Sequence, residues 1–385
     1  PDEVLPYPVA AEVFEPDTLV LYFSEILKKE FAENALNFSI EGIGNPVWIS
    51  AAEPDYSVIT MKFGAGFEKG ELYYVNISDS ISDCVGNMVA INSSFRFGIA
   101  DSVVAGDIII NEILFNPLSG GSDFVEIYNN SDKLCDLKNL WFINKDEAGD
   151  VDDSYSIASI SRLLLPGEYC AISEDTQFLI DNYYVPYTQN LYETSSLPSL
   201  ADDMGNIFIT DRFMNILDSV YYTDDQQYKL LASDDGVSLE RINFERSSSD
   251  LANWHSASET AGFATPGYKN SQYSDEIVTE TTITLNPEVF SPDNDGVDDR
   301  LEIIYKLDQP GYTATIAVYS ADGKFITYIA NNEMLSVQGM LFWDGFDNGN
   351  NLCPVGIYVI YVEMFNLSGN KVVEKHAAVL SRRVN

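Results

Sequence analysis

Short apolar runs recur along the whole chain and alternate with polar clusters rich in Gly, Asn, Asp and Pro. The runs contain many β-branched and aromatic residues, which fit a pleated, half-buried sheet better than a helix. Runs of this kind at regular spacing predict an all-β fold built from sandwiches. The clearest predicted strands are 19–23, 58–63, 72–77, 108–114, 124–128, 207–210, 314–319 and 357–364.

Helical periodicity is confined to two short segments, Leu27–Leu36 and Thr176–Tyr183, and no strand–helix–strand alternation indicates a parallel sheet. The predicted fold class is therefore all-β, with three tandem immunoglobulin-like β-sandwich domains. We expect a helix content well below the ~30% that is usual for globular proteins.

Alternation within the strands predicts which side chains are buried. In the run that begins at Phe124, successive side chains point to opposite faces, so Phe124 and Glu126 share one face and Val125 lies on the other. We expect Phe124, Ile110 and Trp343 to be buried.

A chain of 385 residues is longer than one hydrophobic core usually supports, and two stretches interrupt the strand pattern. One lies near Ala100–Gly106. The other is the polar, Pro- and Gly-marked stretch Thr265–Glu276, which we predict to be a linker. The predicted domains are residues 1–104, 105–272 and 273–385.

The charge of the chain is strongly negative, with 60 acidic and 21 basic residues and a net charge of −39. Such a surface repels phosphate backbones and anionic headgroups, so we expect no nucleic-acid partner. It also offers oxygen ligands for hard cations such as Ca²⁺. No apolar stretch approaches the ~20 residues needed to span a bilayer, so no membrane span is expected. The chain opens without a basic or apolar leader, and we expect any signal peptide to have been removed.

The four cysteines are Cys84, Cys135, Cys170 and Cys353, and their spacing matches no zinc motif. Only the middle block holds two of them, so Cys135–Cys170 is the one intradomain disulfide to consider. The alternative is four buried free thiols, because cysteine also behaves as a small core hydrophobe.

The middle block contains IIINEILFNP (108–117), SDFVEIYNNS (122–131), LLLPGEYCAIS (163–173) and a closing NWHSASETAGFATPGYKNS (253–271). This order resembles the lamin tail domain, an immunoglobulin-like sandwich of nuclear lamins and many bacterial secreted proteins. The resemblance covers nearly all of 105–272.

The other two blocks also resemble known modules. The last block carries NPEVFSPDNDGVDDRLEIIY (286–305), a WDG turn (343–345) and GIY (356–358), and it resembles the immunoglobulin-like module related to the flagellar hook-capping protein, as found in secreted Bacteroidetes proteins. The first block, with VLYFSEILKKEFAENALNFSI (20–40) and a DCVGN turn (83–87), resembles bacterial Ig-like domains of surface-layer type.

Candidate catalytic residues are few. Glu112 and Glu126 are the pair that a search for an acid and a base would test first. The other interpretation is that they are strand carboxylates satisfied by backbone amides or Tyr hydroxyls. The two histidines, His255 and His376, lie in different blocks, and no GxSxG elbow accompanies either. We therefore predict no catalytic site.

A cation site is suggested by the acidic run 293–299. When Gly296 is aligned with the glycine of an EF-hand loop, Asp293 and Asp295 fall at positions 3 and 5 and Glu302 at position 12. Ser291 at position 1 departs from the pattern, and no flanking helices are predicted. The alternatives are a calcium site at Asp293, Asp295 and Glu302, with the acidic loop 144–153 as a second location, or a turn that binds no metal.

Together these features predict a non-enzymatic region of a secreted or cell-surface protein that acts in adhesion, display or as a structural spacer. Its partner would be a protein or glycan at the cell surface, and its location extracellular. The alternative is an accessory binding or targeting module of a larger secreted hydrolase or nuclease. A further hypothesis is that the last block is a secretion signal.

Overall fold

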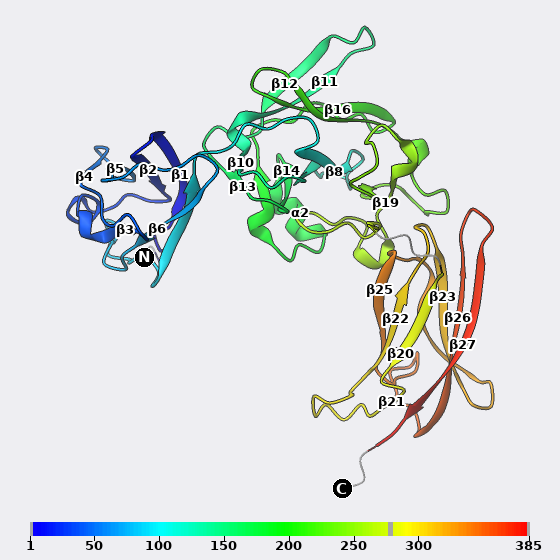
Figure 1. The fold of residues 1–385 in the computed structure, drawn as a ribbon. Helices are drawn as coiled ribbons and strands as arrows, with labels where there is room; N and C mark the ends of the chain where they lie inside the picture. Colours follow the sequence, from blue (N-terminus) through cyan, green and yellow to red (C-terminus); the bar gives the residue numbers. More distant parts are fainter. Residues whose placement is uncertain (1–2, 276–279, 383–385) are drawn as a thin grey trace.

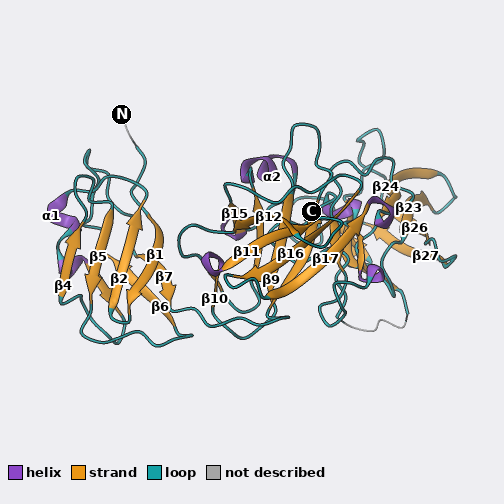
Figure 2. Cartoon of the chain, turned by 90° about the horizontal axis from the view of Figure 1, so that it is seen from above, coloured by secondary structure: helices purple, strands orange, loops and turns teal. Residues whose placement is uncertain are grey.

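The computed structural model describes residues 3–275 and 280–382. It is an all-β structure, with 44% strand and 8% helix, as the apolar pattern predicted. The strands form three groups that follow one another along the chain, and the middle group lies between the other two (Figure 1). The helices are short (Figure 2). No helix among the described residues is long and apolar enough to cross a membrane.

The first group, which we call the first block, has one sheet of four strands and one of three, in the orders β1-β2-β5-β4 and β3-β6-β7. In β2 the residues Leu19, Leu21 and Phe23 point inward and alternate with less buried neighbours, which is the period of two expected for a sheet with one core face. The strands are β1 (Pro8–Glu15), β2 (Thr18–Phe23), β3 (Phe38–Ile40), β4 (Trp48–Ala51), β5 (Val58–Lys62), β6 (Leu72–Ile77) and β7 (Ser93–Gly98).

The helix predicted at Leu27–Leu36 is much shorter in the structure. The α-helix α1 covers Lys29–Ala32, and a 3-10 turn follows at Ala35–Asn37. The break has a local cause, because the Asn34 side chain accepts a hydrogen bond from the Leu36 amide and so competes with helix continuation. The second predicted helix is present as α2 (Thr176–Asn182), and the Asp175 side chain caps it.

The middle block packs a six-stranded sheet, β15-β14-β9-β8-β18-β19, against a four-stranded sheet, β12-β11-β16-β17, and a short β10-β13 pair completes it. Its strands are β8 (Ile108–Leu114), β9 (Phe124–Asn129), β10 (Cys135–Asp136), β11 (Leu140–Lys145), β12 (Val151–Ser156), β13 (Leu163–Leu164), β14 (Tyr169–Ser173), β15 (Leu191–Glu193), β16 (Met204–Asp211), β17 (Ile216–Thr223), β18 (Leu239–Arg241) and β19 (Trp254–Ser256). Its 3-10 turns are 137–139, 188–190, 224–226, 251–253 and 259–261.

Both faces of the six-stranded sheet are covered. Val125 and Ile110 face the main core, whereas Phe124 faces a second apolar cluster that includes Leu179 of α2 and Ala264. Phe124 and Ile110 are therefore buried as predicted, and the alternation along β9 is confirmed. Every residue of β8 is buried because this second apolar cluster covers the sheet face opposite the main core. A sheet packed on only one face would leave alternate residues exposed.

The stretch Thr265–Glu276 was predicted to be a linker, and the structure contradicts this over most of its length. Thr265 and Gln272 have no exposed surface, and Asn270 is also buried. The polar residues that made the stretch look like a linker are hydrogen-bonded inside the middle block. Residues 276–279 lie outside the described part of the chain.

The last block packs a three-stranded sheet, β20-β22-β25, against a five-stranded sheet, β21-β27-β26-β23-β24. Trp343 is buried as predicted, with its ring edge-on to Phe290 and Tyr358 and its indole N–H donating to the Phe346 carbonyl. The strands are β20 (Thr282–Asn286), β21 (Val289–Phe290), β22 (Leu301–Lys306), β23 (Thr313–Ser320), β24 (Phe325–Met334), β25 (Gln338–Trp343), β26 (Gly356–Phe365) and β27 (Lys371–Leu380).

Candidate functional sites

Three glutamates lie side by side in the middle block. Glu112 of β8 is directly opposite both Glu126 of β9 and Glu240 of β18 in the strand register, so the three carboxyl groups share one sheet face. None of the three has exposed surface. The sequence identified Glu112 and Glu126 as a pair, but not Glu240, which is adjacent only through strand pairing.

The three carboxyl groups hold the chain that follows β19. We call residues 263–272 the closing segment. Its backbone amides donate one hydrogen bond to each glutamate: Thr265 N to Glu112 Oε1 (2.8 Å), Gly267 N to Glu126 Oε2 (2.5 Å) and Gln272 N to Glu240 Oε2 (2.8 Å). Side chains complete the shell, with Ser238 Oγ on Glu112, Asn111 Nδ2 on Glu126 and Ser271 Oγ on Glu240.

The hydrogen bonds require a proton on this carboxyl cluster. Thr265 Oγ1 lies 3.0 Å from Glu112 Oε2 and 2.9 Å from Glu240 Oε1, yet a hydroxyl carries a single proton. One of the two contacts must therefore be donated by a protonated carboxyl group. Burial, and then the charge of Glu240, raise the pKa of Glu112 to about 8, so Glu112 is the natural holder of this proton.

The environment of Glu112 and Glu126 argues against acid–base catalysis. A general acid or base must reach its substrate, and these side chains are sealed beneath the closing segment. Their oxygens accept hydrogen bonds from backbone amides and hydroxyls, as the second interpretation of the sequence described. The carboxyl cluster therefore organises the closing segment.

The acidic run of the last block forms a compact loop. One carboxylate oxygen from each of Asp293, Asp295 and Asp299 lies within 4.8 Å of the other two. Asp299 Oδ2 accepts from the Gly296 amide (2.8 Å), whereas its Oδ1 is buried and has no hydrogen-bond partner in the described structure. Oxygen clusters of this kind suit a hard divalent cation.

Glu302, the third ligand suggested by the EF-hand alignment, does not belong to this group. It lies on β22, and its Oε2 accepts a hydrogen bond from Asn286 Nδ2 (3.1 Å). In an EF-hand the loop leads into a helix that returns the twelfth residue to the ion. Here the loop leads into an extended strand, so Asp299 lies beside Asp293 and Asp295 instead. The other acidic loop, 144–153, forms the tip of the β11–β12 hairpin.

The four cysteines are free thiols in the structure. Cys135, Cys170 and Cys353 are buried, but Cys84 is exposed, so the expectation of four buried thiols is wrong at that position. Cys84 lies in the turn that Asp83 organises by accepting hydrogen bonds from the Val85, Gly86 and Asn87 amides, and this turn faces solvent. Burial raises the pKa of the Cys135 and Cys170 thiols to about 12.

Thiol labelling should therefore show one fast-reacting cysteine. Because the thiolate is the reactive species, the buried thiols with raised pKa should be inert near neutral pH while Cys84 reacts at once. The measurement is labelling by a thiol-specific disulfide reagent, native and in denaturant, with Cys84→Ser as the control that removes the fast phase. A mass two hydrogens lower in the joined Cys135 and Cys170 peptides would instead support the disulfide.

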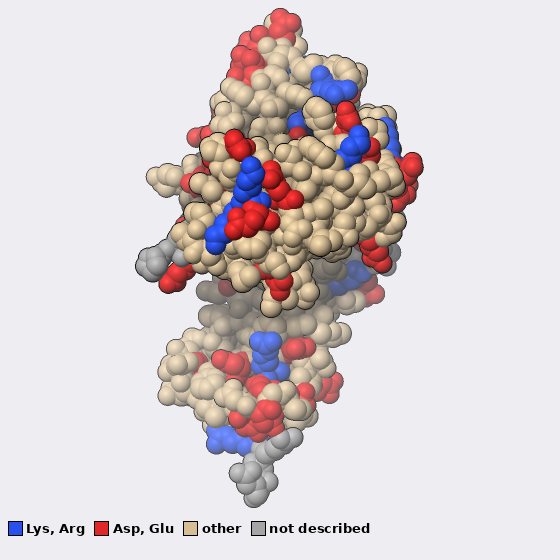
Figure 3. All heavy atoms as spheres, turned by 90° about the vertical axis from the view of Figure 1, so that its left-hand side faces the viewer, with Lys and Arg blue, Asp and Glu red and all other residues tan. Residues whose placement is uncertain are grey.

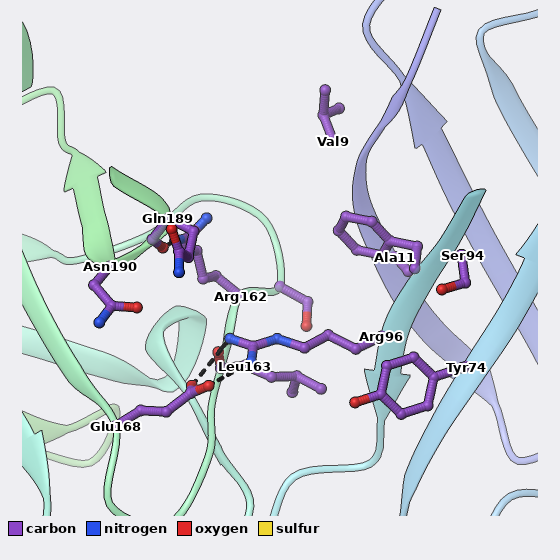
Figure 4. Close-up of a pocket in the computed structure, with 12 residues that line it drawn as sticks. Val9, Ala11, Tyr74, Ser94, Arg96, Arg162, Leu163, Glu168, Gln189 and Asn190 are labelled. Atoms are coloured by element: carbon purple, nitrogen blue, oxygen red, sulfur yellow. Dashed lines mark hydrogen bonds and ion pairs between the residues drawn. The ribbon is translucent and has the colours of Figure 1, made fainter. Parts of the chain in front are cut away.

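A pocket of about 450 Å³ lies between the first and middle blocks (Figure 4). Arg96 of β7 reaches across it and pairs with Glu168 through both guanidinium nitrogens (2.6 and 3.0 Å), and also donates to the Leu163 carbonyl (2.9 Å). Arg162 and Gln189 lie on the wall formed by the middle block. We call this the inter-block pocket. No sequence pattern predicts this pocket, because its walls come from segments that are far apart in the chain.

Acidic side chains are spread over the molecule. On the face shown in Figure 3 they occur on both the upper and lower parts, and the Lys and Arg side chains lie near them and form no continuous basic patch.

Comparison with solved structures gives weak overall likeness. The N-terminal part of the bacterial S-layer protein SbsC is 16% identical, with 57% of this chain and 44% of that chain covered and a TM-score of 0.23. Dimeric latent PorU from Porphyromonas gingivalis is 9% identical, with coverage of 98% and 34% and a TM-score of 0.22. A Ca²⁺-stabilized adhesin of an Antarctic bacterium is 10% identical, with coverage of 100% and 75% and a TM-score of 0.17. The chain spans about half the length of the first S-layer structures. At these TM-scores the matches do not bear on function.

Family models are more specific. Residues 3–98 match the model of a bacterial Ig-like domain, and residues 102–241 match the model of the Lamin Tail Domain. No curated protein matches the chain. Both matches agree with the β-sandwich blocks seen in the structure and with the sequence resemblances of the first and middle blocks. The chain thus carries a bacterial Ig-like domain followed by a lamin tail domain.

Proposed function

We propose that this chain is a non-enzymatic region of a secreted or cell-surface protein that displays or spaces other parts of that protein and contributes to adhesion. The observation that carries the proposal is the bonding at both joints between blocks. Arg96 and Glu168 join the first block to the middle block, and Tyr228 Oη and Thr313 Oγ1 (2.8 Å) join the middle block to the last. Three sandwiches bonded in series form a stiff spacer, whereas flexible linkers would not.

Surface exposure is the direct test of this proposal. Intact cells of the native host would be treated with a membrane-impermeant amine-reactive label or with protease, and the chain followed with an antibody. We expect the chain to be labelled and cleaved on intact cells or recovered from the medium, while a cytoplasmic marker stays protected. Protection of the chain together with that marker would contradict the proposal.

The last block completes the spacer as a hook-capping-type Ig-like domain of the kind found in secreted Bacteroidetes proteins. The family models stop at residue 241, so this assignment rests on sequence motifs and packing. The WDG turn places Trp343 against Phe290 and Tyr358, and Gly345 adopts φ +82°, a left-handed conformation that favours glycine.

Calcium is the cation that this surface region would meet, and the Asp293, Asp295 and Asp299 group is its proposed site. Binding offsets the repulsion among three neighbouring carboxylates and provides a partner for the buried Asp299 Oδ1. Because calcium binds only the folded state, it should raise the melting temperature of the last block, and extracellular modules commonly bind it at about 10⁻⁴–10⁻³ M.

We expect millimolar CaCl₂ to raise the melting temperature more than NaCl at equal ionic strength, since simple screening acts equally in both. The measurement is differential scanning calorimetry of the full chain. Asp299→Asn should abolish the calcium-specific shift, whereas Glu302→Gln should leave it intact. Equal shifts from both salts, unaffected by Asp299→Asn, would mean that the loop is a turn without a metal.

A further inference from the structure

The inter-block pocket has the size and composition of a ligand site. Its volume of about 450 Å³ falls within the ~300–1,000 Å³ usual for small-molecule pockets. Its walls are mixed, with apolar Val9, Ala11 and Phe95 beside polar Ser94 and Gln189. A pocket of this kind accommodates a molecule with both a nonpolar face and several hydrogen-bonding groups.

The two walls are held in place without a ligand. Besides the Arg96–Glu168 pair, Glu12 of β1 accepts hydrogen bonds from Lys138 Nζ (2.7 Å) and from the Ser161 amide (2.9 Å). These contacts join the first block to the middle block at more than one place. The pocket is therefore preformed, which reduces the entropy that a ligand would lose in ordering it.

Arg162 supplies an available cationic group. Its Nη2 donates to the Gln189 and Leu191 carbonyls, and its guanidinium forms no ion pair with a carboxylate among the described residues. Arg162 and Arg212 are the two arginines of the middle block without a carboxylate partner among the described residues, and of these two only Arg162 lines the inter-block pocket. The planar fork of arginine matches a carboxylate.

The remaining lining groups suit hydroxyls and a sugar ring. The Tyr74 side chain is 49% exposed at the pocket edge, and its hydroxyl has no hydrogen-bond partner in the described structure. The side chains of Ser94 and Gln189 are exposed and can donate and accept. The Tyr74 ring offers a nonpolar surface on which the C–H face of a pyranose can pack. Figure 4 shows Tyr74 and Ser94 across the opening from Arg162 and Gln189.

We propose that the inter-block pocket binds a saccharide that carries a single carboxylate, such as a uronic acid at the end of an otherwise neutral glycan. The net charge of −39 disfavours a polyanion, so one carboxylate on a neutral chain is the form that this surface accepts. The inference rests on the proposed surface role, because it names the glycan that an exposed spacer would contact.

Calorimetric titration of the purified full chain provides the test. The probe is cellobiouronic acid, a glucuronic acid–glucose disaccharide, and the matched neutral probe is cellobiose. We expect saturable binding of the acid, affinity at least about tenfold weaker for cellobiose, and a similar loss with Arg162→Gln, since a charge-assisted bond pair is removed. Arg212→Gln is the charge-matched control, because exposed Arg212 packs on Phe213 outside the pocket, and it should bind like the wild type.

A second variant guards against a structural effect of Arg162→Gln. Ser94→Trp fills the pocket from the exposed edge of β7 and leaves the hydrogen bonds of Arg162 in place, so it should also abolish binding while the melting temperature stays unchanged. Equal binding of acid and neutral probes, binding unchanged by either variant, or no binding at millimolar probe would overturn the proposal. None of these outcomes would affect the surface-labelling result, so the two proposals can fail separately.

Discussion

Replacing Arg241 with Met should destabilise the middle block by about 3–5 kcal/mol, because it leaves one partner of a buried ion pair without its counter-charge. The Arg241 side chain is only 4% exposed and pairs with Asp218 (3.0 Å), which is 13% exposed. The guanidinium also donates to the Ile110, Asn243, Phe244 and Arg246 carbonyls and to Ser248 Oγ. Methionine keeps much of the volume but satisfies none of these acceptors.

The measurement must report on the middle block alone, because unfolding of a chain with several domains is not a single two-state step. Hydrogen exchange of β8 and β18 amides across a urea series gives that local free energy. Arg246→Met is the matched control, since its pair with Asp250 is about half exposed and should be worth ~1 kcal/mol or less. The double variant Arg241→Met/Asp218→Asn should recover part of the loss. Equal losses of unfolding free energy in Arg241→Met and Arg246→Met would show that the buried ion pair stabilises the block no more than the exposed one.

Stability of the middle block should fall as the pH rises from about 5 to 9, and Glu112→Gln should reduce that fall. The pKa of Glu112 is raised from 4.5 to about 8 by burial and by the Glu240 charge. Between these values the folded state keeps a proton that the unfolded state releases, so the free energy of unfolding decreases as pH rises. At about 1.4 kcal/mol per pKa unit, the full effect is on the order of 5 kcal/mol.

Glutamine at position 112 should preserve the hydrogen bonds between β8 and the closing segment. Its oxygen can accept from the Thr265 amide and Ser238 Oγ, and its amide can donate to Thr265 Oγ1, which then donates to Glu240. We expect the variant and the wild type to be equally stable near pH 5 and the variant to be the more stable near pH 9.

Hydrogen exchange of β8 amides across the pH series gives the comparison. Weaker surface repulsion at low pH would also stabilise an acidic chain, so the difference between variant and wild type is the informative quantity. Glu147→Gln, at the exposed tip of the β11–β12 hairpin, removes the same charge and should leave the pH profile unchanged. Parallel profiles for Glu112→Gln and the wild type would mean that Glu112 is ionised in the folded state.

The carboxyl cluster shows where sequence reasoning reached its limit. Alternation along β9 correctly placed Glu126 on the face of Phe124, because the direction of a strand side chain depends only on local backbone geometry. That Glu240 joins the cluster depends on β18 pairing with β8 across more than 120 residues. No local pattern encodes that register.

The acidic loop 293–299 shows the same limit over a shorter distance. Asp293 and Asp295 lie together as the motif indicated, because two residues apart in a tight loop they have little freedom to separate. Whether Asp299 or Glu302 joins them depends on the segment after the loop. That segment pairs with β20 and β25 as a strand, and the strand carries Glu302 away.

The sequence by itself determined the all-β class, the positions of most strands and the burial of Trp343, Phe124 and Ile110. These follow from the period of the apolar residues and from β-branched and aromatic content, which act within a few residues of chain. Only the tertiary structure decided that much of the predicted linker 265–276 is buried, that three glutamates hold this segment by hydrogen bonds and that Arg96 and Arg162 line one pocket. Each of these joins segments that are distant in the chain, and their meeting is set by strand pairing and by the docking of blocks.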